Sequence, residues 1–221
     1  MPEPAADLPE PRAVIFDLDG TLVDTVETRI RAWLTVLAEE GIPASRPFVA
    51  ALIGSDGRRL AREAAAAAGM QLAAGRDELI DERCGEIYAA INTNPRLLRG
   101  VVDLLRRLDA RRIPWAIATS SRREQVAASV RALERAEPPT VVDGTHVEHA
   151  KPAPDLLLLA ARELGTDPRG CWYVGDATWD MLAATAAGMI AVGVTTGAAD
   201  AATLRTAGAR HVVASLAELE I

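Results

Sequence analysis

A series of short apolar runs, the first of which ends on an acidic residue, constrains the fold more than any other feature of this sequence. The runs at 13–16, 115–118, 141–142, 172–174 and 190–194 have the length and apolar content of buried parallel strands. Helix-like segments separate the later runs, at 101–108, after Ser121, at 155–164 and up to Gly188. Strands and helices in alternation predict an α/β protein with a doubly wound parallel, Rossmann-like sheet and right-handed crossovers.

The long stretch between the first two apolar runs has helical periodicity instead. Ile30, Trp33, Leu34 and Leu37 recur at helix spacing, and the alanine-rich segment 61–68 stops at Gly69. We therefore expect a Rossmann-like core formed by residues 1–24 and 95–221, with a helical cap domain inserted at 25–94. A chain of 221 residues is long enough for one core with a smaller insertion.

Polar side chains follow directly on three of the predicted strands. Asp17, Thr119 and Asp176 each come after an apolar run, and parallel sheets place their sites at the carboxyl ends of the strands. Asp19 stands two residues after Asp17, and Gly20 allows a tight turn behind the pair. One carboxylate can attack a phosphorus atom while its neighbour handles the proton of the leaving group. Taken alone, the pair of acids also fits a solvated turn.

Composition narrows the partners and the compartment. The formal net charge of −7 argues against nucleic acid or an anionic membrane as the main partner, because both favour a basic face. No stretch approaches the length of a membrane span, and residues 1–11 lack the basic region of a signal peptide. Cys84 and Cys171 stand far apart without a metal-ligand pattern, which indicates two reduced thiols. These features predict a cytoplasmic protein.

The basic residues are almost all arginine. Only one of the 24 lysine and arginine residues is a lysine, and it is Lys151. A compact ammonium group fits a crowded anion site where the planar guanidinium fork does not, so this exception favours a role for Lys151 in such a site.

With these residues in view, the chain resembles the haloacid dehalogenase-like hydrolase superfamily, in its branch with a helical cap after the first strand. The likeness extends from Val14 to about Leu219. It rests on four motifs in order: Asp17-x-Asp19-Gly20-Thr21, the strand-terminal Thr119, Lys151-Pro152-x-Pro154-Asp155, and Gly175-Asp176-x-x-x-Asp180. The resemblance implies catalytic roles for Asp17 as nucleophile, Asp19 as general acid and base, Thr119 as a hydrogen-bond donor to the transferring phosphoryl group, and Lys151 as the neutraliser of charge.

The resemblance also implies a bound Mg²⁺. Its ligands would be Asp17, the main-chain carbonyl of Asp19, and Asp176, with Asp180 binding through water or supporting the ligands. A carboxylate that attacks a phosphate dianion needs a divalent cation to offset repulsion, and oxygen ligands with room for water favour magnesium. Because Asp19 must carry a proton to assist the leaving group, we expect a raised pKa for it in the occupied, closed site.

Five residues are candidates for contact with the substrate. Gly54-Ser55-Asp56-Gly57 looks like the substrate-contacting loop of the cap in relatives, although as bare sequence it is a turn before a helix with Asp56 as N-cap. Arg29 either contacts an anionic substrate or lies with Arg31 on a solvated helix face. The candidates are Gly54, Ser55 and Arg58 of this loop and helix, Arg29, and Ser120 beside Thr119.

Two other features are assigned to structure. His146 and His149 lie three residues apart in a polar loop, with only Glu148 as a further nearby ligand. We therefore expect solvated histidines, and a minor role in lining the site entrance stays open. Trp179 is expected to pack a helix.

Differences from known relatives distinguish between the reactions that occur in this superfamily. Dehalogenases lack the second acid, which is present here as Asp19, and β-phosphoglucomutase-like relatives carry a cap histidine where Arg29 stands. The cap also lacks the lysine of the phosphonatase branch. The sequence thus favours a magnesium-dependent phosphatase that acts on a small phosphorylated metabolite, such as phosphoglycolate or a sugar phosphate, through an aspartyl-phosphate.

The sequence bears on three alternatives to this function. A mutase-like phosphotransferase stays open. A signalling receiver module is shorter, has no cap and accepts phosphate on an internal strand, and an inactive binding module would lack a motif residue. Both a monomer and a homodimer are compatible with the sequence.

Overall fold

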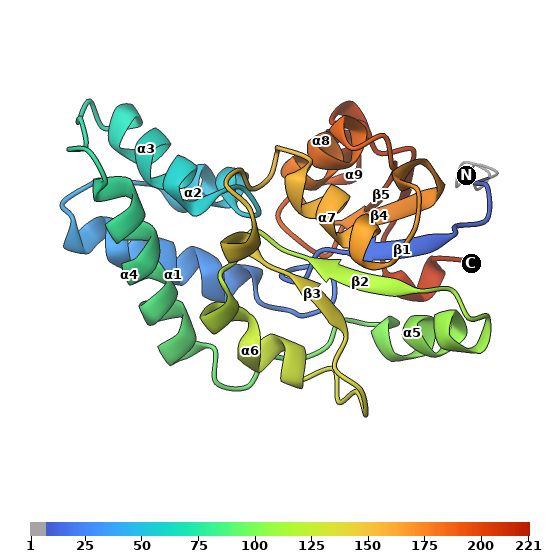
Figure 1. Ribbon diagram of the computed structural model, residues 1–221. Helices are drawn as coiled ribbons and strands as arrows, with labels where there is room; N and C mark the ends of the chain where they lie inside the picture. The colour runs from blue at the N-terminus through green and yellow to red at the C-terminus, as the bar shows by residue number, and fades with distance from the viewer. Residues whose placement is uncertain (1–7) are drawn as a thin grey trace.

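A computed structural model describes residues 8–221 of the chain (Figure 1). Residues 1–7, which fall within the predicted core segment 1–24, lie outside the described residues. The helices within 8–221 are α1 Val26–Glu39, α2 Arg46–Leu52, α3 Gly57–Ala67, α4 Arg76–Ile91, α5 Val101–Ala110, α6 Arg123–Arg131, α7 Asp155–Glu163, α8 Thr178–Ala186 and α9 Ala201–Thr206. The strands are β1 Ala13–Phe16, β2 Trp115–Ala118, β3 Thr140–Val142, β4 Cys171–Gly175, β5 Ile190–Val194 and β6 His211–Val213.

The strands form one parallel sheet in the order β3-β2-β1-β4-β5-β6. The predicted doubly wound α/β fold and its first five strands are confirmed. Strand β6 was not predicted, because it has only three residues, two of them partly buried, and so forms no extended apolar run. The strand order reverses between β1 and β4, and such a switch point is where doubly wound sheets bind their ligands.

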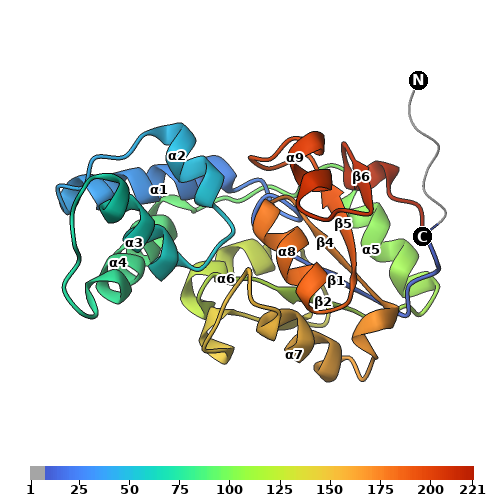
Figure 2. The same cartoon turned by 90° about the horizontal axis from the view of Figure 1, so that it is seen from above.

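Side chains alternate along β1 and so build a core on each face of the sheet. Val14 and Phe16 point into a cluster with α5 and α6, whereas Ala13 and Ile15 point into a second cluster with α7, α8 and α9. Figures 1 and 2 show these two layers on opposite sides of the strands. All four side chains are fully buried, which is why β1 reads as a continuous apolar run.

Helices α1 to α4 pack around a third apolar core of their own, at the left of Figure 1. The two chain segments that link them to the sheet run side by side. Asp24 N donates to Arg96 O at 2.8 Å, and Leu98 N donates to Leu22 O at 3.0 Å. This pairing places the helical part beside the carboxyl ends of the strands. The boundaries predicted at 25 and 94 stay a prediction.

The helix predicted at 61–68 corresponds to α3, which begins at Gly57, before the alanine-rich segment. Asp56 caps α3, because its Oδ1 accepts from Arg58 N at 2.9 Å, as expected for this residue type. The cap brings Gly57 to the first position of the helix. None of the helices between residues 8 and 221 combines the length and apolar content that a membrane span requires.

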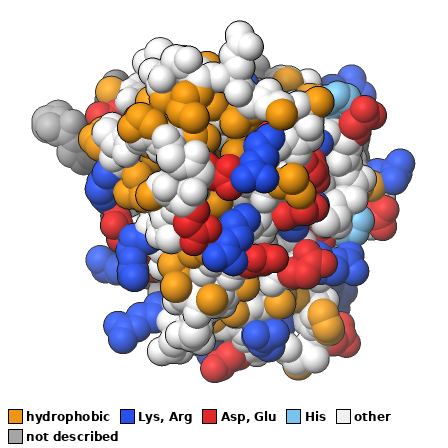
Figure 3. All heavy atoms as spheres, turned by 90° about the vertical axis from the view of Figure 1, so that its left-hand side faces the viewer, with side chains coloured by type: hydrophobic (Ala, Val, Ile, Leu, Met, Phe, Trp, Pro, Cys, Tyr) orange, Lys and Arg blue, Asp and Glu red, His pale blue; other side chains and the backbone are white. Residues whose placement is uncertain are grey.

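The face formed by the helical part carries charges of both signs (Figure 3). Acidic and basic side chains are interspersed there, and several pair with one another: Arg62 with Asp77, Arg76 with Glu40, and Arg83 with Glu39. Exposed pairs of this kind contribute little to stability.

Two adjacent leucines of α7 test where the core lies. Leu157 is fully buried against the sheet and Leu158 is 41% exposed. Leu157→Ala should lower the free energy of unfolding by about 2–5 kcal/mol, because it leaves a cavity in a packed core. The matched Leu158→Ala should change it by only about 0.5 kcal/mol. Urea unfolding followed by circular dichroism measures both values, and similar losses in the two variants would contradict the assigned face.

Candidate active site

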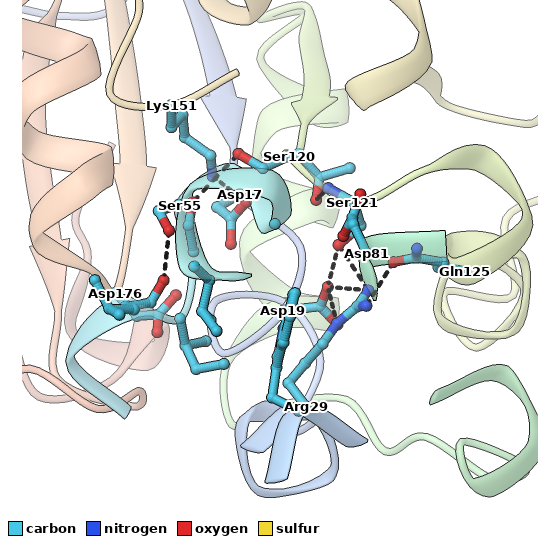
Figure 4. Close-up of a pocket in the computed structure, with 17 residues that line it drawn as sticks. Asp17, Asp19, Arg29, Ser55, Asp81, Ser120, Ser121, Gln125, Lys151 and Asp176 are labelled. Carbon is cyan, nitrogen blue, oxygen red and sulfur yellow. Dashed lines mark hydrogen bonds and ion pairs between the residues drawn. The ribbon is translucent and has the colours of Figure 1, made fainter. Parts of the chain in front are cut away.

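The strand register places two acids side by side at the carboxyl edge of the sheet. Phe16 of β1 pairs with Val174 of β4, and Asp17 N donates to Val174 O at 2.9 Å. Asp17 and Asp176 therefore leave neighbouring strands close to the same point. Both line a cavity of ≈ 50 Å³ between the sheet edge and the helical part (Figure 4).

Lys151 joins two carboxylates at the base of this cavity. Its Nζ lies 2.6 Å from Asp17 Oδ1, 2.7 Å from Asp180 Oδ1 and 3.2 Å from the hydroxyl of Tyr173. The lysine side chain has no solvent exposure, and the charges of both acids raise its pKa against the opposing effect of burial. Among residues 8–221, no group donates to the second oxygen of Asp17. That oxygen is the one available for reaction.

Asp17, Asp176 and Asp180 form a cluster that fits a divalent cation. One carboxylate oxygen from each lies within 4.8 Å of the others, and all three side chains are buried. Burial raises the pKa of Asp17 to about 7 and raises the pKa of Asp176 well above its usual range, and repulsion between the acids adds to both shifts. Three acids with one ammonium group leave excess negative charge, and an all-oxygen donor set suits magnesium.

Asp176 is held in place by a hydroxyl and by two glycines. Thr21 Oγ1 donates to its Oδ1 at 2.9 Å. A Cβ on Gly197 would lie 1.6 Å from Asp176 Oδ2, and one on Gly20 would lie 2.5 Å from it. Gly20 also has φ +83°, which favours glycine. Asp180 differs from Asp176 in that its Oδ2 accepts from Ala177 N at 2.9 Å, so both of its oxygens already have partners.

Asp19 lies across the cavity, enclosed by donors from the helical part. Its carboxylate accepts from Thr25 Oγ1 at 2.6 Å, from Tyr88 OH at 2.8 Å and from Arg29 Nη2 at 2.9 Å. Ser121 Oγ, from the loop after β2, donates at 3.0 Å. Burial opposes its charged form, but Arg29 and the hydroxyls hold the pKa of Asp19 below its usual value. The raised pKa expected for Asp19 refers to the occupied, closed site and stays a prediction; the contact with Arg29 was not foreseen from the sequence.

Arg29 is not a solvated surface residue, and that alternative was wrong. It is 7% exposed, its guanidinium lies 3.5 Å from the centre of the Tyr88 ring, and its Nη1 donates to Gln125 Oε1 at 2.6 Å. Figure 4 shows it pointing from α1 toward Asp19 and the loop after β2. Its pKa is raised mainly by the charge of Asp19, despite burial.

The loop after β2 supplies three hydroxyls to the site. Thr119 is 2% exposed and lines the cavity, and its Oγ1 accepts from Ser121 N at 3.2 Å. Ser120 Oγ donates to Gly54 O at 3.2 Å, which joins this loop to the loop before α3.

The candidates for substrate contact divide into those that line the cavity and one that lies outside it. Gly54, Ser55, Ser120 and Arg29 line the cavity with the motif residues. Arg58 lies outside it, where it contacts Asp56 at 2.7 Å and Glu148 O at 2.9 Å. Direct contact between Arg58 and a phosphoryl group at Asp17 is therefore not supported by this geometry.

Several residues of this site were not predicted from the sequence, among them Ser121 and Thr25, which donate to Asp19. Tyr88, Gln125 and Asp81 reach the cavity or Asp19 from helices, and Tyr173 and Thr21 support Lys151 and Asp176. Thr21 belongs to a motif that was recognised, so its hydroxyl could have been proposed as a ligand support. The helical residues carry no sequence signal beyond ordinary polarity.

His146 and Trp179 have structural roles, as the sequence indicated for Trp179. His146 Nδ1 accepts from Asp143 N at 3.0 Å, so this histidine caps a turn, and it is exposed, as expected for a loop histidine. Trp179 Nε1 donates to Ala51 O at 3.1 Å, and Arg59 lies 4.4 Å from the centre of its ring. His149 is largely exposed.

Comparisons with known proteins place the chain in a family. Residues 14–194 match the model of the haloacid dehalogenase-like hydrolases, and the chain belongs to that family. It is 35% identical over 183 residues to a phosphoglycolate phosphatase of Xanthomonas campestris, covering 82% of each chain. It is also 35% identical over 182 residues to a fructose-1-phosphate phosphatase of Escherichia coli, covering 82% of this chain and 95% of that one.

A solved structure agrees with this assignment. The crystal structure of a hydrolase from Pseudomonas syringae is 33% identical and superposes with a TM-score of 0.89 over 93% of this chain and 94% of that chain. The resemblance drawn from the four motifs is thus confirmed at the level of the family.

Gly197 offers a test of the cation site. In Gly197→Ala the new methyl group would displace the Asp176 carboxylate, since the two cannot occupy the same space. We expect Mg²⁺ affinity, measured by isothermal titration calorimetry, to fall about 10–100-fold with the fold retained. The control is Gly170→Ala, whose methyl group would press only on the flexible Arg12 side chain. Unchanged affinity in Gly197→Ala would contradict a site that uses Asp176.

Proposed function

We propose that the protein is a magnesium-dependent phosphatase that hydrolyses a small phosphate monoester through a phosphoryl group carried on Asp17. The observation that carries this proposal is the buried Asp17 carboxylate, bonded through one oxygen to Lys151 and left without a donor on the other. The family and the names of two relatives support a phosphatase. A cytoplasmic location is part of the proposal, and the two cysteines, both buried and unpaired, are compatible with it.

In the first step the free oxygen of Asp17 attacks phosphorus and the bond to the leaving oxygen breaks. Lys151 orients Asp17 and offsets its charge, while Thr119 and Ser120 line the place where the phosphoryl oxygens would lie. When bound at Asp17 and Asp176, Mg²⁺ supplies the positive charge that lets an anionic nucleophile approach an anionic ester. Such transfers depend mostly on positioning and electrostatics.

Asp19 serves the two proton transfers. Donors from α1, α4 and the loop after β2 fix its position opposite Asp17. The same donors keep it ionised, which suits its second task of taking a proton from the water that attacks the phosphoaspartate. For its first task, protonation of the leaving oxygen, the pair with Arg29 has to loosen so that the pKa rises. A group in this role contributes about 10²- to 10⁴-fold to the rate.

The proposed acceptor of the phosphoryl group on Asp17 is water, and not a second hydroxyl group of a sugar. The position where mutase-like relatives carry a histidine is Arg29, and its guanidinium is already bonded to Asp19, Gln125 and Ser121. It therefore has no free group that would hold the enzyme for a second phosphoryl transfer.

Asp17→Asn tests the proposal directly. The amide has the size of the acid but cannot form the phosphoaspartate, so phosphate release from a panel of phosphorylated metabolites with Mg²⁺ should fall to background. Asp24→Asn is the control, because this acid lies in the same segment and is exposed. Its activity should match that of the unaltered protein. Turnover by Asp17→Asn at a rate near that of the control would rule out the covalent step.

A further inference from the structure

The proposed reaction leaves the nature of the leaving group open, and two adjoining spaces bear on it. The cavity at Asp17 has a volume of ≈ 50 Å³. By the same measure one water needs about 10–15 Å³, so this space holds roughly a phosphoryl group and little more. A second cleft of ≈ 240 Å³ adjoins it and shares Gly57, Asp81 and Ser120 with it. The rest of a substrate would have to extend past these three residues into the cleft.

Asp81 of α4 lies at the junction of the two spaces. A Cβ on Gly57 would lie 1.8 Å from Asp81 Oδ1, so the carboxylate occupies the place that any other residue at 57 would fill. Asp81 Oδ2 accepts from Arg122 Nε at 3.2 Å, and no group within residues 8–221 donates to Oδ1. The junction thus offers one free carboxylate oxygen to whatever passes it. Figure 4 shows Asp81 on the same side of the cavity as Arg29 and Ser121.

The positive charges around the two spaces are already paired. In the cavity, Arg29 is bonded to Asp19 and Lys151 to Asp17 and Asp180. In the cleft, Arg58 pairs with Asp56 and Glu78, and Arg122 pairs with Glu78, Asp81 and Glu82. A carboxylate on the leaving group would therefore meet Asp81 with no spare cation from the lining residues. A hydroxyl group would instead find an acceptor there.

We propose that the natural leaving group is a neutral polyol, a sugar or sugar alcohol, that donates a hydroxyl hydrogen bond to Asp81, and not a hydroxy acid such as glycolate. This inference rests on the proposed phosphatase function. It selects between a sugar phosphate and phosphoglycolate, the two kinds of ester in the names of the relatives. Burial also raises the pKa of Asp81, which agrees with a carboxylate short of donors. Asp81 then determines substrate specificity by direct contact with the leaving group.

Matched pairs of esters test the proposal. Hydroxyethyl phosphate and phosphoglycolate differ only in a CH₂OH or a carboxylate group, as do glucitol 6-phosphate and 6-phosphogluconate. With Mg²⁺ the unaltered protein should have a kcat/KM at least about tenfold higher for the polyol member of each pair. In Asp81→Asn this ratio should fall about tenfold, because the polyol loses a bond to a charged acceptor and the acid loses a repulsion.

Two further variants separate recognition from support of the fold. Glu82→Gln removes a charge from the next residue of α4, which also faces Arg122 but does not line the cleft, and should leave the ratio unchanged. Arg122→Gln breaks the ion pair of Asp81 while keeping its carboxylate, so the polyol preference should persist or increase, because the acid member then meets an unpaired carboxylate. If Asp81→Asn lowered both members of a pair equally, the proposal would be overturned.

The outcome with the unaltered protein keeps this inference distinct from the proposed function. Release of phosphate from p-nitrophenyl phosphate with a preference for the acid members would overturn the polyol assignment and leave the phosphatase standing. Absence of phosphate release from every ester, the activated one included, would overturn both. A polyol preference that depends on Asp81 supports both.

Discussion

The buried ammonium group of Lys151 makes the rest of the site possible, because it balances carboxylates that could not otherwise lie together in a core. It contacts Asp17 and Asp180 within 2.7 Å and is wholly shielded from solvent. Breaking such a pair by removal of one partner typically costs about 3–5 kcal/mol, since a buried charge is left alone. The geometry also explains why the lone lysine of an arginine-rich chain stands here: a point charge can touch two acids and Tyr173 at once.

The two carboxylates proposed for catalysis are positioned by different parts of the fold. Asp17 takes its surroundings from strand ends and the loops behind them, whereas most donors to Asp19 come from the inserted helices: Thr25 precedes α1, Arg29 lies on it, and Tyr88 lies on α4. Tyr88 is in turn fixed by Asn92, whose Nδ2 donates to the phenol oxygen at 2.9 Å. Movement of the helical part would therefore alter the pKa of Asp19 while leaving Asp17 and its lysine in place.

The residues that gather around Asp17 could be predicted from the sequence, whereas the surroundings of Asp19 could not. Asp17, Thr119 and Asp176 could be placed together because each follows an apolar strand and parallel strands end at one edge. Lys151 stood out both by its motif and as the lone lysine of the chain. The environment of Asp19 could not be predicted, because it depends on how α1 and α4 pack, and Arg29, Tyr88 and Gln125 resemble ordinary helix residues. Asp81 was missed for the same reason, and β6 because an edge strand of three residues carries no pattern.

The central claim is that Asp17 carries the phosphoryl group while Asp19 moves protons, and trapping of the intermediate tests it most directly. Asp19→Asn and Asp17→Asn would each be mixed with radiolabelled p-nitrophenyl phosphate and Mg²⁺, quenched in acid and assayed for label on the protein. An activated leaving group needs little protonation, so Asp19→Asn should become phosphorylated and stay so, because water lacks its base. The account predicts label on Asp19→Asn and none on Asp17→Asn; equal labelling of the two variants would contradict it.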